Sequence, residues 1–141
     1  MKPLISTLQF LTVSLFMFLS ANLSAQSGPL YIYNHTGCYF EFNILAHDYG
    51  CTDDACQPGI VCIVPGTNVI SPCGPSHVEW AAADVVPVDA NCEFCGVYGS
   101  TVERINSCGT GTTRNPRIAT CDNECGTVTV SFISPFEIMI N

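Results

Sequence analysis

Apolar and polar residues alternate with a period of two in several short runs of the chain, a pattern typical of β-strands. The clearest run covers residues 38–45 and has one apolar and one mixed face. A β-rich run at residues 30–33 precedes it, and the two are separated by Asn34-His35-Thr36-Gly37. Asn and Gly suit the positive φ angles of a tight turn. We therefore predict a β-hairpin over residues 30–46.

A second pair of strands is predicted in the middle of the chain. Residues 60–64 and 67–71 flank Pro65-Gly66, which resembles a two-residue turn in which proline fixes φ. If the alternation holds, Cys62 points inward together with the residues two places before and after it.

The last part of the chain shows the same pattern. Residues 127–132 alternate, a Ser-Pro pair interrupts, and the alternation resumes. This predicts either a second hairpin or a corner between two sheets. Phe136, Ile138 and Ile140 share one face, so we expect the final strand to belong to the core.

Helix signals are weak. Residues 78–85 contain good helix formers, but eight residues are marginal without tertiary support, so we expect one short helical turn there at most. The remaining stretches are rich in Gly, Pro, Asp, Asn, Thr and Cys, and we interpret them as loops: residues 51–59, 72–76, 86–95 and 109–116. The sequence thus predicts an all-β fold, a small antiparallel β-sandwich with Greek-key connections.

The N-terminus has the features of an export signal. Lys2 provides a positive charge, residues 4–19 are mainly apolar, and Leu23-Ser24-Ala25 provides a small-residue exit. We predict cleavage after Ala25, so residues 1–25 are a signal peptide and residues 26–141 form a single disulfide-rich β domain. The mature chain is then secreted, extracellular or periplasmic, without membrane insertion.

The charge of the mature chain excludes some partners. Lys2 is the only lysine and leaves with the signal, so three arginines face twelve acidic residues. Such an acidic chain lacks the basic patch that neutralises phosphates, and we expect it not to bind nucleic acid.

Cysteine content indicates a disulfide scaffold, because ten cysteines in a short exported chain normally pair completely. The sequence leaves the pairing open. The predicted disulfide cysteines are Cys38, Cys51, Cys56, Cys62, Cys73, Cys92, Cys95, Cys108, Cys121 and Cys125.

An alternative is a metal or redox site. Cys92 and Cys95 are separated by two residues and Cys121 and Cys125 by three, a spacing that can place four thiolates around zinc. The Cys92–Cys95 spacing also occurs in reactive dithiols. An oxidising compartment and six further cysteines favour disulfides instead, so we predict no cofactor.

Loop acids offer a candidate calcium site, from Asp48, Asp53 and Asp54 or from Asp84 and Asp89. Their spacing matches no EF-hand loop, and acids in turns commonly cap them, so we assign no metal ligands.

We also assign no catalytic residue. The three histidines, His35, His47 and His77, are scattered, and the chain has no Gly-x-Ser-x-Gly motif to present a nucleophile.

Aromatic residues are the remaining candidates for recognition. Trp80, Tyr98 and the tyrosines of the first predicted hairpin, Tyr31 and Tyr33, are able to form a platform for a carbohydrate or protein partner. Strand alternation puts these two tyrosines opposite Leu30 and Ile32, so one of the two pairs faces outward. Asn34-His35-Thr36 is a sequon for hosts that glycosylate such sites.

Together these features predict a secreted, non-enzymatic binding or surface-structural module with a protein or glycan partner. The alternatives are a small secreted hydrolase with an acidic, metal-dependent loop site, or a secreted toxin or inhibitor.

Overall fold

The computed structural model describes residues 28–47, 56–73, 79–104 and 113–141, and the predicted signal peptide lies outside these ranges. The described residues form strands and one short 3-10 turn, η1, at Cys121–Asn123. The strands are β1 (Leu30–Asn34), β2 (Tyr39–His47), β3 (Ile60–Ile63), β4 (Gly66–Ile70), β5 (Glu79–Val88), β6 (Ser100–Glu103), β7 (Arg117–Ala119), β8 (Thr127–Ser134) and β9 (Glu137–Ile140). The all-β prediction is therefore confirmed. No helix in these ranges is long and apolar enough to cross a bilayer.

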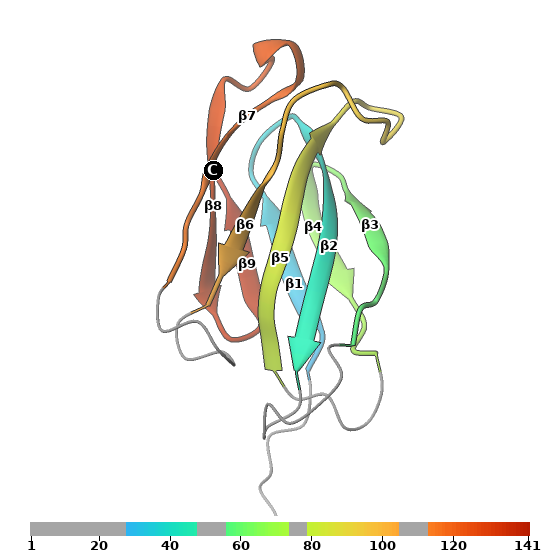
Figure 1. The fold of residues 1–141 in the computed structure, drawn as a ribbon, viewed down its shortest axis with the longest axis vertical. Helices are drawn as coiled ribbons and strands as arrows, with labels where there is room; N and C mark the ends of the chain where they lie inside the picture. The colour runs from blue at the N-terminus through green and yellow to red at the C-terminus, as the bar shows by residue number, and fades with distance from the viewer. Residues whose placement is uncertain (1–27, 48–55, 74–78, 105–112) are drawn as a thin grey trace, which may run out of the picture.

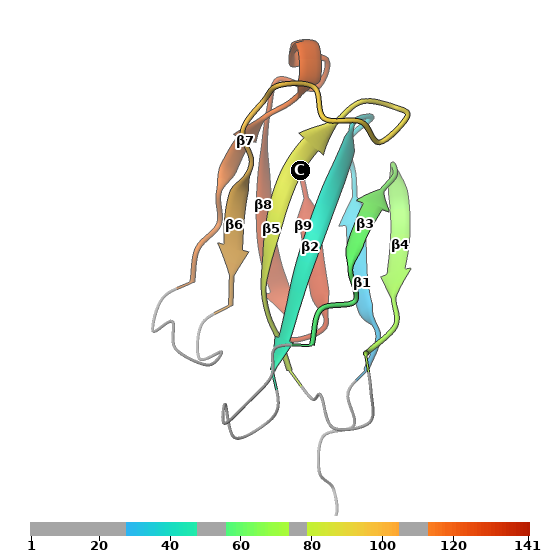
Figure 2. The same ribbon diagram turned by 45° about the vertical axis from the view of Figure 1, so that its right-hand side comes forward.

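The strands form two sheets that pack face to face (Figures 1 and 2). One has five strands in the order β4-β1-β9-β8-β7, and the other has four in the order β3-β2-β5-β6. Neighbours are antiparallel except β1 and β9, which run parallel. This pair departs from the antiparallel prediction, because no turn joins β1 to β9 and none fixes their relative direction. The Greek-key connection pattern stays a prediction.

The predicted hairpin over residues 30–46 is wrong in its pairing, although both strands exist. β1 pairs with β4 and β9, whereas β2 pairs with β3 and β5. The turn between β1 and β2 carries the chain from one sheet to the other, so the apolar faces of both strands meet in the core. The same holds for β3 and β4, which belong to different sheets. Alternation identifies a strand and its buried face but not its hydrogen-bonding partner.

The hairpin alternative for the last two strands is confirmed. β8 and β9 pair in antiparallel register, with Val130 opposite Ile140 and Phe132 opposite Ile138. Ile138 and Ile140 are fully buried, and Phe136 packs against the core.

The predicted helical turn at residues 78–85 is wrong, because β5 runs through Glu79–Val88. β5 lies between β2 and β6, and pairing on both sides outweighs the helix propensity of its alanines. It also takes in the first residues of the predicted loop at 86–95.

The inward orientation predicted for Cys62 is wrong as well. Ile63 is the buried residue of β3, whereas Ile60 is 69% exposed and Val64 is 44% exposed. The buried face of this edge strand is thus shifted by one residue, and Cys62 is free to bond outside the core.

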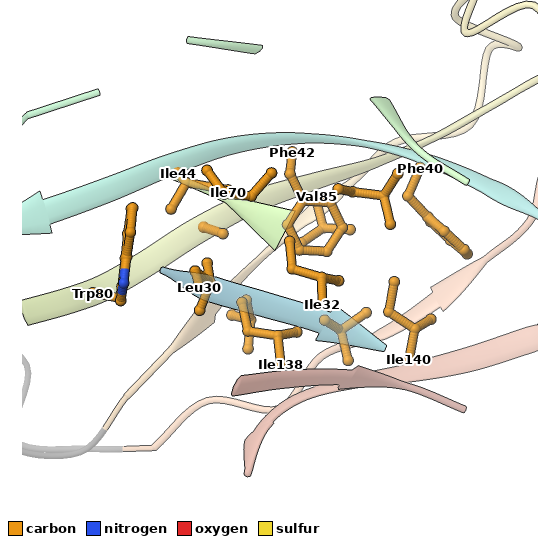
Figure 3. Close-up of a cluster of buried hydrophobic side chains, with 14 of the residues drawn as sticks. Leu30, Ile32, Phe40, Phe42, Ile44, Ile70, Trp80, Val85, Ile138 and Ile140 are labelled. Atoms are coloured by element: carbon orange, nitrogen blue, oxygen red, sulfur yellow. The ribbon is translucent and has the colours of Figure 1, made fainter. Parts of the chain in front are cut away.

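A single apolar core fills the space between the sheets (Figure 3). Phe40, Phe42 and Ile44 from β2 face Leu30 and Ile32 from β1, all without solvent exposure. Burying such side chains contributes about 1.5–3 kcal/mol each. This rigid core leaves the outer faces, the edges and the loops as the surfaces available for function.

Candidate binding surface

Four disulfides staple the described part of the chain. They join Cys38 to Cys125, Cys56 to Cys73, Cys62 to Cys92 and Cys95 to Cys121. The disulfide prediction is confirmed for these eight cysteines, while Cys51 and Cys108 lie outside the described residues.

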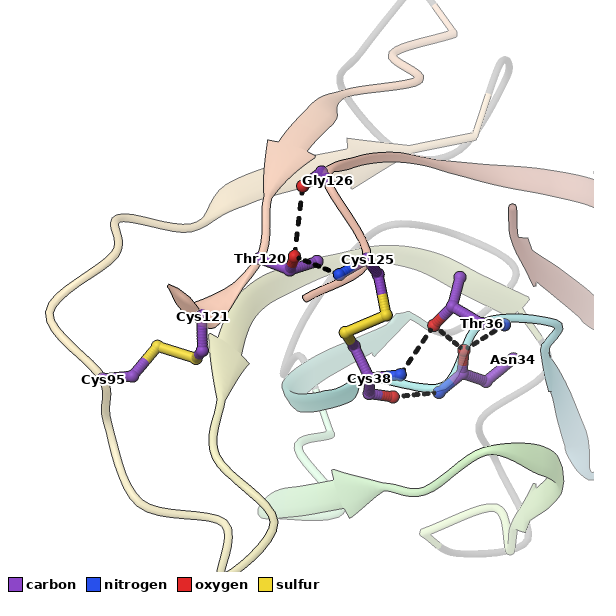
Figure 4. The surroundings of a disulfide bond; sticks show 8 residues. All are labelled: Asn34, Thr36, Cys38, Cys95, Thr120, Cys121, Cys125 and Gly126. Atoms are coloured by element: carbon purple, nitrogen blue, oxygen red, sulfur yellow. Dashed lines mark hydrogen bonds between the residues drawn. A yellow bond between two sulfur atoms is a disulfide. The ribbon is translucent and has the colours of Figure 1, made fainter. Parts of the chain in front are cut away.

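The zinc and redox alternatives are contradicted by this pairing. Cys92, Cys95, Cys121 and Cys125 belong to three different disulfides. Figure 4 shows two of them, Cys38–Cys125 and Cys95–Cys121. A sulfur in a disulfide has no thiolate to offer a metal or a substrate.

The sequon at Asn34 is a structural element of the first turn. Asn34 is 2% exposed, and its Nδ2 donates to the carbonyl oxygen of Cys38 at 2.8 Å. Its Oδ1 accepts from the backbone amide of Thr36 at 3.1 Å and from the Thr36 hydroxyl at 2.7 Å (Figure 4). With both side-chain atoms engaged in a buried turn, Asn34 is not an acceptor for glycosylation in the folded protein.

The described histidines do not come together. His35 is exposed in the β1–β2 turn, where its Nδ1 lies 3.2 Å from Asn141 Oδ1. His47 ends β2, and a strand of this length spans roughly 27 Å at about 3.3 Å per residue. The two residues therefore lie at opposite ends of the fold, and His77 is outside the described residues.

The candidate calcium ligands that the structure describes have other roles. Asp84 accepts a hydrogen bond from the Thr101 hydroxyl at 2.7 Å. Asp89 accepts from the backbone amides of Asn91 and Glu93 at 2.8 and 2.9 Å. The bonds from Glu93 and Asn91 lower the pKa of Asp89, so its charge stabilises the turn. Asp48, Asp53 and Asp54 lie outside the described residues.

Among the described residues, no three His, Cys, Asp or Glu side chains form a group able to hold a metal ion. Residues that the structure describes also line at least two clefts. One, of about 240 Å³, is lined by Tyr39, Val88, Asp122, Glu124 and the turn at residues 89–91, together with Cys38 and Cys121.

The other cleft, of about 300 Å³, contains the ion pair between Arg104 and Glu79, with Nη2 and Oε2 3.0 Å apart. Arg104 Nε also donates to the carbonyl oxygen of Trp80 at 3.0 Å. The guanidinium thus joins the residue after β6 to the start of β5, which is a structural role.

The candidate aromatic residues have three different environments. Trp80 is 2% exposed and belongs to the core, so it is excluded from any platform. Tyr98 is 90% exposed in the loop between β5 and β6. Alternation predicted that one of the two pairs, Tyr31 and Tyr33 or Leu30 and Ile32, faces outward, and the structure shows that it is the tyrosine pair.

The two outward tyrosines lie in the middle of a continuous surface. Their ring centroids are 6.5 Å apart, with an interplanar angle of 11°. In the strand register, Val69 and Glu137 flank Tyr31, and Met139 flanks Tyr33. We refer to these five residues as the tyrosine face.

The tyrosine face combines apolar contact area with polar groups. Tyr31 is 37% exposed and Val69 is 55% exposed. The Tyr33 hydroxyl donates to Glu137 Oε1 at 3.2 Å. Desolvation and this hydrogen bond raise the pKa of Tyr33 above its usual value, so the phenol remains a hydrogen-bond donor. Flat rings with hydroxyl edges are suited to recognition.

Comparison of the chain with protein families, curated proteins and solved structures finds no match.

Sequence reasoning overlooked one surface feature. The sequence has no charged residue between positions 55 and 78. The described part of that stretch forms one edge strand of each sheet, β4 and β3. The lack of charge in this stretch could have indicated an unusual edge, because exposed edge strands commonly carry charged residues that prevent aggregation.

Proposed function

We propose that this chain is an exported, non-enzymatic binding module and that the tyrosine face is its contact surface. The observation that carries the proposal is the near-parallel Tyr31–Tyr33 pair on the outer side of the five-stranded sheet, where Tyr31 is exposed and Tyr33 is half-buried. Rigid aromatic groups on a sheet offer a large contact area at low entropic cost.

The export part of the proposal rests on residues 1–25 and on the disulfides. A charged start, an apolar run and a small-residue exit fit cleavage after Ala25. Disulfides persist in oxidising compartments, and four of them in so small a domain fit an extracellular or periplasmic protein.

A neutral glycan is the ligand that we favour. Tyrosine rings pack against the apolar faces of sugars. The Tyr33 hydroxyl already donates to Glu137, so this pair offers its oxygen atoms as acceptors for the hydroxyl groups of a sugar. The face has one carboxylate and no basic side chain, which disfavours sulfated or phosphorylated ligands.

The test is binding of the purified protein to a panel of neutral glycans, anionic glycans and surface proteins. Tyr31→Ala and Tyr33→Ala should each weaken neutral-glycan binding by about tenfold or more, as expected for aromatic anchors. Tyr31→Phe, which keeps the ring, should retain most of the affinity.

Tyr98→Ala is the matched control, because Tyr98 is exposed but lies off the tyrosine face. Binding that depends on Tyr98 and not on Tyr31 or Tyr33 would refute the assignment. Binding of a surface protein that depends on Tyr31 or Tyr33 would confirm the tyrosine face as the contact surface but would refute a neutral glycan as its ligand.

A further inference from the structure

The two neighbouring edge strands β3 and β4 carry no charged residue. All twelve acidic residues lie outside the stretch between positions 55 and 78. Within that stretch β4 is the edge of the five-stranded sheet and β3 is the edge of the four-stranded sheet. Figure 2 shows both strands at the right-hand side of the molecule. Unprotected edges of this kind pair readily with other strands.

This side also exposes apolar side chains. Ile60, Val64 and Val69 are 69%, 44% and 55% exposed. The structure around them is fixed: the Cys56–Cys73 disulfide joins the segment before β3 to the segment after β4. The Asn68 side chain accepts from Val64 N at 3.1 Å and donates to Val64 O at 2.9 Å. The edge is thus held in a preorganised conformation, which lowers the entropic cost of binding.

The backbone of β4 has hydrogen-bonding groups directed at the open edge. In β1, the amides of Tyr31 and His35 donate to Phe136 and Ile140, on the β9 side. The intervening residues of β1 therefore face β4, and one of them, Ile32, is opposite Asn68. It follows that Thr67 and Val69 direct their N–H and C=O groups away from β1, where no described strand lies.

We infer that the β4 edge is the contact between two copies of this chain. Two β4 strands in antiparallel orientation, related by a two-fold axis at Asn68, place Thr67 opposite Val69 of the partner subunit. Each such pair is able to exchange two backbone hydrogen bonds. The contact is isologous and closes at two copies, because it uses the same strand of each.

Charge identifies a second copy as the occupant. Two mature molecules, each with twelve acidic residues and three arginines, repel one another wherever their acidic surfaces meet. The edge formed by β3 and β4 carries no charged residue, so two copies are able to approach through it without this repulsion. A basic partner, by contrast, is attracted to the acidic surfaces rather than to this edge.

The β4 edge is favoured over β3 because of its neighbours. Glu41 is opposite Cys62 of β3 in the four-stranded sheet. Beside β4, by contrast, Tyr31 and Tyr33 are opposite Val69 and Thr67. A β4–β4 contact joins two five-stranded sheets and places two tyrosine faces side by side, although the inference does not depend on what those faces bind.

The test is the mass of the purified protein by sedimentation equilibrium over a micromolar to millimolar series. The unmodified protein should approach twice the monomer mass, and Val69→Lys should weaken dimerisation by about tenfold or more, since charge on an edge opposes pairing. Ala119→Lys, at the exposed opposite edge of the same sheet, is the matched control and should leave dimerisation unchanged.

Val69→Pro gives a second variant, because it removes an amide that faces the open edge and not β1. It should reduce dimerisation while the thermal transition stays near that of the unmodified protein. Amide exchange provides the local readout: Thr67 and Val69 should gain protection as concentration rises, and residues 117–119 should not. A protein that stays monomeric throughout, or a dimer that protects other amides, would overturn the inference.

Discussion

The indole nitrogen of Trp80 donates a hydrogen bond to the carbonyl oxygen of Gly28 at 3.0 Å. The bond joins β5 of the four-stranded sheet to the residues just before β1 of the five-stranded sheet, 52 positions away in the sequence. Trp80 thus fills the core and also fixes where the first strand begins.

We predict that the two roles of Trp80 are separable by substitution. Trp80→Phe keeps most of the apolar contact but leaves the Gly28 carbonyl without its donor, so it should cost about 1–3 kcal/mol of unfolding free energy. Trp80→Ala also leaves a cavity and should cost about 3–5 kcal/mol. Urea unfolding followed by circular dichroism measures both, and equal losses would contradict the separation.

We also predict complete pairing of the ten cysteines. Intact-mass measurement after alkylation should find no reactive thiol in the native protein and ten after reduction. Reduction should lower the melting temperature sharply, because each disulfide that closes a loop of some 15 residues or more contributes about 3 kcal/mol in the chain-entropy model. Two alkylated thiols in the native protein, at Cys51 and Cys108, would restrict the pairing to the eight described cysteines.

Strand β9 should be indispensable to the fold, since it pairs with β1 on one side and β8 on the other. Removal of residues 135–141 should unfold the protein at room temperature, because the loss approaches the total stability of a small domain. Ile138→Ala should cost about 2–5 kcal/mol, whereas Met139→Ala, on the outer face, should cost much less. A truncated protein that melts with the full-length one would contradict this placement.

The turn at Asp89 should make the thermal stability of the protein decrease at acidic pH. Amide hydrogen bonds hold the pKa of Asp89 below its ordinary value of 3.8. Its stabilising effect is therefore fully present above that value and disappears as the pH falls through the lower folded-state pKa. Asp89→Asn keeps the acceptor oxygen but removes the charge. In this variant the melting temperature should depend less on pH in the acidic range where Asp89 titrates. The variant should match the unmodified protein most closely in acid, and identical pH profiles would refute the role of the carboxylate.

The histidines should be dispensable. Changing His35, His47 and His77 together to Gln should leave the affinity of any ligand, or the turnover of any substrate, within about threefold. Loss of a general acid or base reduces turnover by roughly a hundredfold or more. Matched melting curves provide the folding control, and a hundredfold drop in a folded variant would favour the hydrolase alternative.

Local pattern was enough to predict the strands and most of their faces. The run from Cys38 to Leu45 became β2 with its apolar face buried, and Tyr31 and Tyr33 faced outward as their position opposite Leu30 and Ile32 allowed. These features depend on a two-residue period, which the backbone imposes locally.

The pairing of strands and of cysteines could not be predicted from the local sequence pattern. Two strands joined by a short turn either pair or cross to the other sheet, and the 30–46 and 60–71 segments cross. The alanines after Trp80 read locally as helix, yet contacts with β2 and β6 place them in a strand. Pairings such as Cys38 with Cys125 depend on how the whole chain folds.

The parallel pairing of β1 with β9 has a consequence for the speed of folding. Ile32 is opposite Ile138, so contacts at the centre of the larger sheet join segments from the two ends of the described chain. Bringing together two segments so far apart in sequence costs chain entropy before the contact between them can stabilise the fold. Folds dominated by such non-local pairs form in milliseconds to seconds. The Cys38–Cys125 disulfide, across 87 positions, joins the turn after β1 to the residues just before β8. Oxidation of this pair holds two distant segments of the chain together covalently, so a non-local contact persists once it has formed.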